Sequence, residues 1–228
     1  MTGCSDMQRV FDVCLSGVAI TILSPVLFIT CIILRFTGEG EIFYRQTRVG
    51  QHGRAINILK FATMLKNSPN IGTGTVTLKD DPRILPVGRF LRKSKINELP
   101  QLINVLFGDM SLIGPRPQTQ RCFQAFPKSI HVKILSVRPG LSGIGSIVFR
   151  DEELMLHDSN EAERFYDEII MPYKGTLEEW YVNQNSLVTY FVLLFATIWL
   201  LATKKIPLDW PVFSKMPVVP PELRKYII

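Results

Sequence analysis

The chain has 228 residues, of which 46% are hydrophobic, and a formal net charge of +6. This length allows one well-filled core and argues against a second full domain. The positive charge suits anionic lipid headgroups or phosphate substrates. Because the basic residues do not interleave with aromatic residues as they do in nucleic-acid-binding motifs, we expect no nucleic acid partner.

The four cysteines form neither a disulfide framework nor a metal-binding pattern. Cys14 and Cys31 lie in an apolar run, whereas Cys4 and Cys122 are isolated, and no CxxC spacing occurs. We therefore expect small buried hydrophobic side chains in a reducing, cytosolic environment.

The first predicted element is an apolar membrane helix. Between Val10 and Leu34 the only charged residue is Asp12, and about 20 apolar residues suffice to cross a bilayer. The run is too long for a signal peptide and lacks a small-residue cleavage site. Ser24-Pro25 lies in its middle, where proline removes a backbone donor and breaks or kinks the helix, while serine can donate to the freed carbonyl.

The charges that flank this run do not place its ends on opposite sides of a membrane. Arg9 precedes the run, and Arg35, Arg45 and Arg48 follow it. A hairpin that is bent at Ser24 and Pro25, and that enters and leaves by the same face, satisfies both observations. We predict such a re-entrant anchor over residues 1–36. A kinked helix that spans the membrane is the alternative.

The middle of the sequence, residues 37–186, has the charge and the Gly and Pro spacing of one small cytoplasmic α/β domain. No internal repeat is visible. The expected elements are, in chain order, strands at Glu41–Tyr44 and Ala55–Phe61, a polar loop at Asn67–Thr77, helical structure that resumes near Pro86, and a charged helical region at Asp151–Tyr181 with a break at Pro172.

The last segment, residues 187–228, combines an apolar helix with a proline-rich tail. Leu187–Ala202 is short for a membrane span, so it is either a core helix or a helix at the membrane interface. Trp199 and the pair Lys204-Lys205 favour the interface. Five prolines after Ile206 predict an extended tail. The expected fold class is α+β and mainly helical, with a re-entrant anchor and interfacial helices.

The segment between Arg89 and Pro117 contains the residues best suited to bind phosphate. Four cations, Arg89, Arg92, Lys93 and Lys95, lie within seven residues directly before a predicted helix start. We expect Asn97 to be the N-cap of that helix and Pro100 to lie in its first turn. The free N–H groups and positive dipole of a helix N-terminus attract anions.

A rigid arginine follows this predicted helix. Gly114-Pro115-Arg116-Pro117 holds a guanidinium on stiff, extended backbone, which suits two-pronged phosphate binding. Each feature has a plain structural alternative. A basic run is often a solvated surface, Arg116 can pair with a structural carboxylate, and Glu98 can simply offset the helix dipole.

Six short motifs share their order and spacing with a known family. They are Gln46-Thr47-Arg48-Val49-Gly50, Lys60-Phe61-Ala62-Thr63-Met64, Asn97-Glu98-Leu99-Pro100-Gln101-Leu102, Gly108-Asp109-Met110-Ser111, Gly114-Pro115-Arg116-Pro117 and Val137-Arg138-Pro139-Gly140. Together they resemble the monotopic phosphoglycosyl transferases, a family of bacterial sugar transferases. The resemblance runs from the Ser24-Pro25 break through the helices before residue 203.

The resemblance implies a location and a reaction. The bent helix would hold the protein in one leaflet of the bacterial inner membrane, with the active site facing the cytoplasm. The enzyme would transfer a sugar 1-phosphate from a UDP-sugar to polyprenyl (undecaprenyl) phosphate and release UMP, with Mg²⁺ as cofactor. This is the first membrane step of surface glycan biosynthesis (capsule, exopolysaccharide or O-antigen).

The resemblance also implies site residues. In that family an Asp-Glu pair is central, and the Asp attacks the β-phosphate to give a covalent phosphosugar intermediate. The residues expected here are Asn97 and Glu98 for catalysis, Lys60, Arg89, Arg92, Arg116 and Arg138 for substrate phosphate, and Glu98 and Asp109 for the metal. Asp109 has a turn or cap residue as its alternative. The expected partners are the UDP-sugar, polyprenyl phosphate and inner-membrane lipid, with a homodimer left open.

The sequence departs from the family at the position of the nucleophile. Asn97 replaces the Asp, and a carboxamide is a poor nucleophile. Three explanations stay open: an active subfamily in which Glu98 or the lipid phosphate attacks, an engineered substitution that stalls the enzyme, or a membrane-bound binding or scaffold protein in glycan assembly. We favour the active enzyme because the phosphate-binding and magnesium-compatible residues are present. Ala62, where the family commonly has a basic residue, removes one expected substrate contact.

Overall fold

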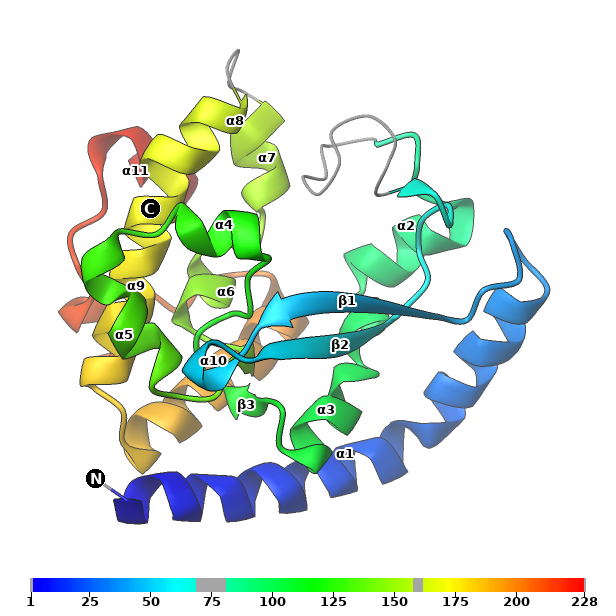
Figure 1. Cartoon of the computed structure of the whole chain (residues 1–228), viewed down its shortest axis with the longest axis horizontal. Coiled ribbons are helices and arrows are strands. Elements are labelled where there is room, and N and C mark those ends of the chain that lie inside the picture. Colours follow the sequence, from blue (N-terminus) through cyan, green and yellow to red (C-terminus); the bar gives the residue numbers. More distant parts are fainter. Residues whose placement is uncertain (1, 69–80, 158–161, 228) are drawn as a thin grey trace.

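The structure is mainly helical, as the sequence predicts, and its helices surround two small sheets (Figure 1). The computed structural model describes residues 2–68, 81–157 and 162–227, so most of the predicted loop at Asn67–Thr77 lies outside the described residues. The elements named below are α1 (Thr2–Arg35), β1 (Phe43–Val49), β2 (Ala55–Phe61), α2 (Pro86–Lys93), α3 (Gln101–Phe107), β3 (Ser111–Ile113), α4 (Gln120–Gln124), α5 (Lys128–Leu135), β4 (Gly140–Ser142), α6 (Ile144–Val148), α7 (Glu152–His157), α8 (Ala162–Phe165), α9 (Met171–Asn183), α10 (Leu187–Thr203) and α11 (Pro221–Ile227).

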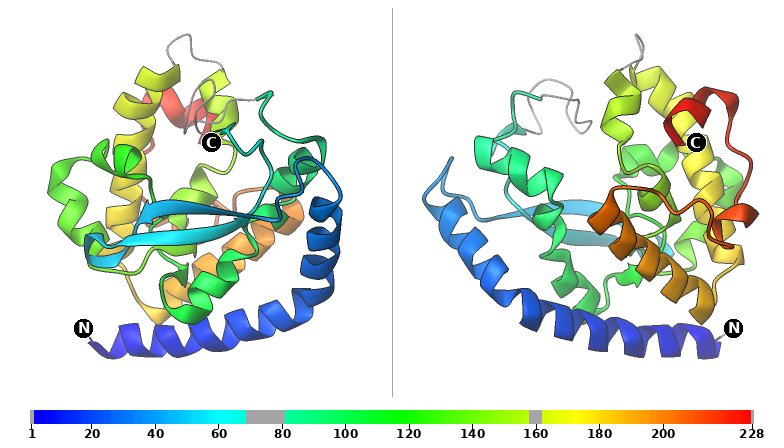
Figure 2. Two further views of the ribbon diagram at one scale, coloured as in Figure 1. Left: turned by 45° about the vertical axis from the view of Figure 1, so that its right-hand side comes forward. Right: turned by 180° about the vertical axis from the view of Figure 1, so that it is seen from behind.

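The N-terminal helix α1 is continuous but bent. Both views of Figure 2 show it running beneath the body of the protein and then rising along one edge. Pro25 lies inside the helix, and the Ser24 hydroxyl donates to the carbonyl oxygen of Thr21 (2.8 Å), which Pro25 has no N–H to reach. The predicted break is therefore a bend in one helix and not a turn between two helices.

Polar side chains attach the first half of α1 to the body. Asp12 is almost fully buried and accepts hydrogen bonds from the Ser111 hydroxyl (3.1 Å), the Leu112 N–H (2.9 Å) and the Tyr190 hydroxyl (2.9 Å). Arg9 donates to the carbonyl oxygens of Val105 and Leu106 at the end of α3. These contacts fix α1 against α3, β3 and α10.

The strands β1 and β2 form an antiparallel hairpin in which Phe43 pairs with Phe61 and Val49 with Ala55. The second strand has the predicted bounds. The first was predicted at Glu41–Tyr44, which is wrong, because the strand begins at Phe43 and runs to Val49. Most of this strand is exposed, so its polar residues do not show the alternation of apolar and polar side chains that marks a half-buried strand.

A second, parallel pair of strands joins two distant motifs. Ser111 of β3 pairs with Gly140 of β4, and Ile113 pairs with Ser142. Neither strand is predictable from the sequence, because three residues are too few to show a strand's alternation of apolar and polar side chains. Their pairing places the residues after β3 beside those before β4.

One buried core includes residues from the middle and last predicted segments, among them Ile58, Ile113, Leu177, Tyr190 and Leu223. Helix α10 has the predicted position. One of its faces packs into this core, while Val188, Phe195, Ile198, Trp199 and Leu201 on the other face are exposed. The helix thus combines a core face with an apolar outer face.

Two predictions near the C-terminus are wrong. Pro172 does not break the charged helical region, because a π-helical turn at Tyr166–Ile170 leads directly into α9 and leaves Pro172 in its first turn. The tail is not extended throughout. Helix α11 begins at Pro221, directly after Pro220, and its Leu223 is fully buried.

Candidate active site

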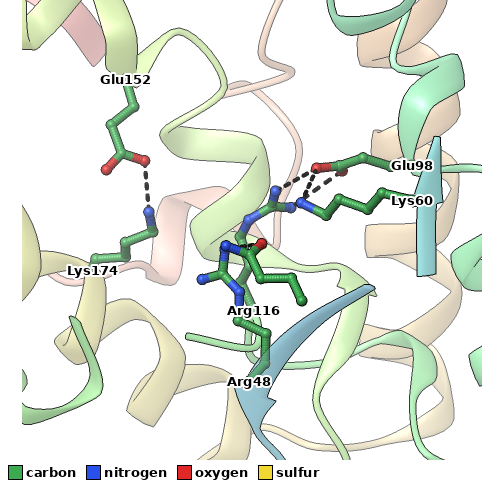
Figure 3. A network of polar contacts seen from close by, with 7 residues as sticks. Arg48, Lys60, Glu98, Arg116, Glu152 and Lys174 are labelled. Carbon is green, nitrogen blue, oxygen red and sulfur yellow. Dashed lines mark hydrogen bonds and ion pairs between the residues drawn. The ribbon is translucent and has the colours of Figure 1, made fainter. Parts of the chain in front are cut away.

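Four charged residues from four segments converge at the centre of the molecule. Figure 3 shows Glu98 in contact with Arg116 and with Lys60 of β2, and Arg48 of β1 beside Arg116. The Arg48 guanidinium donates to Gln46 Oε1 (2.6 Å). Glu98 Oε1 lies 2.7 Å from Arg116 Nη2 and 3.4 Å from Lys60 Nζ. The structure thus joins three of the residues that the sequence predicts.

Glu98 is held by a tight turn. A 3₁₀ turn over Ile96–Glu98 precedes α3, and it begins at Lys95 in the left-handed conformation (φ 60°). The prediction that Asn97 caps the helix is wrong, because no side chain caps the N-terminus of this turn or of α3. The Asn97 side chain is buried, and its Oδ1 has no hydrogen-bond partner.

Lys60 is placed opposite Glu98 by Asn104. This buried residue of α3 accepts a hydrogen bond from the Leu59 N–H and donates to the Asn57 carbonyl, both at 2.9 Å. The Asn104 side-chain amide therefore makes the two backbone hydrogen bonds that a neighbouring strand would make with this part of β2. Asn104 was not among the predicted site residues, since nothing in the sequence distinguishes one Asn inside a helical segment.

Arg116 extends from a backbone clamped between two strands. The Gly114 N–H donates to the Ser142 carbonyl (2.9 Å), and the Gly140 N–H donates to the Pro115 carbonyl (2.8 Å). A Cβ added at Gly140 would lie 2.1 Å from the Gly114 nitrogen, so the two segments approach this closely only because Gly140 has no side chain. These contacts hold the Gly114–Pro117 segment on both sides of Pro115.

The electrostatics of the cluster favour an ionised Glu98. Burial alone would raise the pKa of its carboxyl, but the charges of Arg116 and Lys60 outweigh this effect and hold the pKa well below its usual range. The charge of Glu98 raises the pKa of Arg116 in return. Both members of this pair are therefore charged at neutral pH.

The other two cations are less fully neutralised. Burial lowers the pKa of Lys60 to about 8, although Glu98 opposes the shift. Burial and then the charge of Arg116 lower the pKa of Arg48, whose buried Nε has no hydrogen-bond partner. Three cations therefore surround one carboxylate, and this excess of positive charge attracts an anion. Arg48 was in a recognised motif but was not predicted as a site residue.

The remaining predicted residues have other surroundings or other partners in the structure. Arg89 is exposed on α2. The charge of Arg92 on the same helix helps to lower the pKa of Asp81, after the larger effect of the hydrogen bond from Arg83. Arg138 Nε donates to the Gly108 carbonyl (3.2 Å), and Asp109 accepts from Asn104 Nδ2 (3.3 Å). Because α3, about 10 Å long, separates the turn of Asp109 from Glu98, these two carboxylates do not face one shared ion.

A metal ion here would need most of its ligands from the substrate. The described residues contain no group of three or more His, Cys, Asp or Glu side chains that could hold one. Glu98 is a hard oxygen ligand next to an anion-binding cluster, which fits Mg²⁺, because this ion is commonly held by one or two carboxylates and substrate phosphates. Asp109 does not fit as its partner.

The surface of the molecule carries large apolar side chains on two helices, α1 and the shorter α10. The stretch Asp6–Arg35 of α1 is the one helix in the described part of the chain that is long and apolar enough to cross a membrane. Its exposed side chains include Ile22, Phe28, Ile29, Ile32 and Ile33, and Phe36 follows directly after it. With the outer face of α10, they form an apolar surface larger than isolated exposed residues would give.

Comparison with known proteins gives a consistent set of relatives. The family model for bacterial sugar transferase matches residues 4–204. The exopolysaccharide production protein ExoY of Sinorhizobium fredii is 32% identical over 205 residues, which cover 84% of this chain and 83% of the relative.

Two further relatives match over a shorter region. The UDP-glucose:undecaprenyl-phosphate glucose-1-phosphate transferase of Escherichia coli is 36% identical over 143 residues, 62% of this chain and 31% of the relative. The UDP-N-acetylgalactosamine-undecaprenyl-phosphate N-acetylgalactosaminephosphotransferase of Aeromonas hydrophila is 37% identical over 144 residues, 62% of this chain and 34% of the relative.

Proposed function

The chain belongs to the bacterial sugar transferase family, and from this we propose that it transfers a sugar 1-phosphate from a UDP-sugar to polyprenyl (undecaprenyl) phosphate, with release of UMP. The names of the relatives from Escherichia coli and Aeromonas hydrophila support this reaction type. The relative ExoY supports a role in exopolysaccharide production, at the first membrane step of a surface glycan.

The cluster around Glu98 is the observation that carries the proposal. Arg48, Lys60 and Arg116 bring three positive charges to one carboxylate, and the whole cluster is partly shielded from water. A diphosphate that enters this cluster gains two-pronged contacts from the Arg116 guanidinium, as carboxylates and phosphates commonly do. A UDP-sugar is such a ligand.

The transfer then needs little covalent chemistry from the protein. An oxygen of the lipid phosphate attacks the β-phosphorus of the UDP-sugar and forms a new P–O bond. The bond between the β-phosphorus and the bridging oxygen breaks, and UMP leaves with that oxygen and its electron pair. Arg116 and Lys60 stabilise the negative charge on the non-bridging oxygens as the bonds change.

Direct attack by the lipid phosphate is the route that Asn97 favours. Its carboxamide has no negative charge with which to attack phosphorus, and its side chain is buried. Glu98 is a weak nucleophile here because Arg116 and Lys60 neutralise its charge and hold it in place. We therefore assign Glu98 to orienting the two cations, with attack by Glu98 itself as the alternative route.

We propose Mg²⁺ as the cofactor, with the Glu98 carboxylate as its protein ligand and the diphosphate as the source of its other ligands. When bound, the ion supplies charge neutralisation for the diphosphate and the leaving UMP. Asp109 is no longer part of this proposed site, since it lies at the far end of α3.

The apolar surface supports a position in the bacterial inner membrane. We propose that α1 enters and leaves one leaflet by the cytoplasmic face, with its bend at Ser24 and Pro25, and that the outer face of α10 lies at the interface. Trp199 at the end of α10, followed by Lys204 and Lys205, suits the headgroup region. In this position the lipid phosphate meets the cluster without free diffusion through water.

A UMP-release assay tests the proposed reaction. The purified protein is incubated with a panel of UDP-sugars, undecaprenyl phosphate and Mg²⁺, and free UMP is measured. We expect acceptor-dependent release of UMP with at least one sugar. Silence across the panel, together with activity in the Asn97→Asp variant, would instead point to a disabled enzyme or a binding protein in glycan assembly.

A further inference from the structure

The segment that carries Arg116 has a single backbone donor. Proline has no N–H, so the Arg116 N–H is the only one between Pro115 and Pro117. This N–H donates to Oε1 of Glu178 (3.2 Å), which lies on α9 and is fully buried. A carboxylate behind the arginine therefore accepts the one backbone hydrogen bond that the segment can donate.

We propose that Glu178 is a positioning residue, which fixes the backbone of Arg116 so that its guanidinium reaches Glu98 and the substrate diphosphate. The inference rests on the proposed function and assigns a residue that lies outside the Glu98 cluster. Because a displacement of about 1 Å in a positioning group can cost on the order of 100-fold in rate, a hydrogen bond at this place matters for catalysis.

The Glu178 carboxylate packs against Gly145, which has no side chain. A Cβ added at Gly145 of α6 would lie 2.3 Å from Glu178 Oε1, so Gly145 provides the space that this oxygen occupies. The same added Cβ would lie 3.5 Å from Lys174 Cγ. Any side chain at position 145 would therefore displace the acceptor from the Arg116 N–H.

Burial makes this carboxylate costly for stability. Glu178 Oε2 is buried without a hydrogen-bond partner. The cations that face the carboxyl are Lys174 on its own helix, itself paired with Glu152 of α7 (2.7 Å), and Arg116. A residue selected for stability alone would not leave a buried carboxylate oxygen unpaired, which favours a role for Glu178 in the site.

The hydrogen bond from the Arg116 N–H depends more on the length of the Glu178 side chain than on its charge. Desolvation raises the pKa of Glu178 to about 7, while the Arg116 N–H, Lys174 and Arg116 oppose the shift. A protonated carboxyl keeps a carbonyl oxygen that accepts a hydrogen bond, as the amide of Gln does. An Asp keeps the charge but loses one methylene of length, so it does not reach the Arg116 N–H.

The test compares Glu178→Gln with Glu178→Asp, with Glu179→Gln as the matched control on the surface of α9. We expect Glu178→Asp to lower kcat about 10- to 100-fold with a smaller change in KM, whereas Glu178→Gln and the control keep most of kcat. In an Arg116→Ala background, Glu178→Asp should cost less than about threefold, because the residue acts through Arg116.

Two results would overturn the inference. One is a loss in Glu178→Gln as large as that in Glu178→Asp, and the other is an undiminished effect of Glu178→Asp in the Arg116→Ala background. Should Glu178→Asp fail to fold by circular dichroism, Gly145→Ala makes the same test, since it moves the carboxylate without shortening it. An inactive wild-type protein would count against the proposed reaction, whereas an active wild type with an unaffected Glu178→Asp variant would count against this inference alone.

Discussion

Arg116 Nη2 and Glu98 Oε1 lie 2.7 Å apart, and the two side chains are only 31% and 16% exposed. The residues are 18 positions apart in the sequence and come from different elements. In a pair this well shielded, removal of one member leaves the charge of the other without compensation, which costs more than the loss of one member of a surface ion pair. The pair is therefore the part of the site that is most sensitive to substitution.

We predict that Arg116→Ala lowers kcat/KM for the UDP-sugar about 100-fold or more, equal to ~2.7 kcal/mol of transition-state stabilisation. Arg116→Lys keeps a charge but loses the planar fork, and should recover only part of this activity. UMP release under initial-rate conditions measures both. Lys133→Ala is the control, because Lys133 pairs with Glu179 on the surface. A loss of less than threefold in Arg116→Ala would contradict the role assigned to this residue.

The lowered pKa of Lys60 leads to a prediction about the pH dependence of substrate binding. Its pKa is lowered to about 8, chiefly by burial, so its positive charge is present below that pH and lost above it. We therefore expect kcat/KM for the UDP-sugar to fall as pH rises from 7 to 9. The Lys60→Arg variant should lose this alkaline fall, because an arginine remains charged throughout. An identical alkaline fall in Lys60→Arg would assign the titration to another group.

Asn97 predicts the absence of a covalent intermediate. A carboxamide forms no phosphoester, so the wild-type protein incubated with a [β-³²P]UDP-sugar and no lipid acceptor should take up no label. The Asn97→Asp variant places the carboxylate of the family at this position and should become labelled. Label is followed on denaturing gels. Labelled wild-type protein would show that another side chain attacks, and loss of that label in Glu98→Gln would identify it as Glu98.

Asp12 predicts how α1 is attached to the body. In Asp12→Ala the Ser111 hydroxyl, the Leu112 N–H and the Tyr190 hydroxyl all lose their acceptor in a buried place, at a cost of roughly 2–4 kcal/mol. For a chain of this size Tm should fall by roughly 5–15 °C, measured by thermal unfolding in detergent. Asp6→Asn, on the exposed surface of the same helix, is the control and should leave Tm nearly unchanged. An equal Tm for both variants would contradict the attachment.

The bend at Pro25 predicts that both ends of α1 lie on the cytoplasmic side. Single cysteines at Asp6 and Thr37, in a chain whose four native cysteines are replaced, should react with an impermeant maleimide in inside-out vesicles and not in spheroplasts. Reaction of one position from each side would mean that α1 spans the membrane. Pro25→Ala restores the missing N–H and should favour that spanning form.

Local features of the fold could be predicted from the sequence, whereas long-range ones could not. The apolar runs predicted α1 and α10, and the short β-like stretch at Ala55–Phe61 predicted β2. The strands β3 and β4 were missed because each has three residues and is stabilised only by its distant partner. The helical tail α11 was missed because its five preceding or initial prolines favoured an extended chain.

In the candidate site, likewise, the residues could be predicted from local motifs but their mutual positions could not. Glu98, Lys60 and Arg116 could be named because they lie in recognisable motifs. Their mutual distances could not, because each depends on a different neighbour: Asn104 for Lys60 and Glu178 for Arg116. Arg138 was predicted from a motif as well, yet its guanidinium donates to the Gly108 carbonyl. A motif thus identifies residue types that suit phosphate, and only the fold decides which of them meet.

The position of the β-phosphate after the reaction tests the central claim most directly. The protein in nanodiscs with undecaprenyl phosphate and Mg²⁺ is given a [β-³²P]UDP-sugar, and the organic and aqueous phases are counted. We predict that the label enters the lipid phase in amounts equal to the UMP released, and that Glu98→Gln and Arg116→Ala lower this transfer by the same factor as they lower UMP release. Label that stays in the aqueous phase, as inorganic phosphate or free sugar phosphate, would contradict the account.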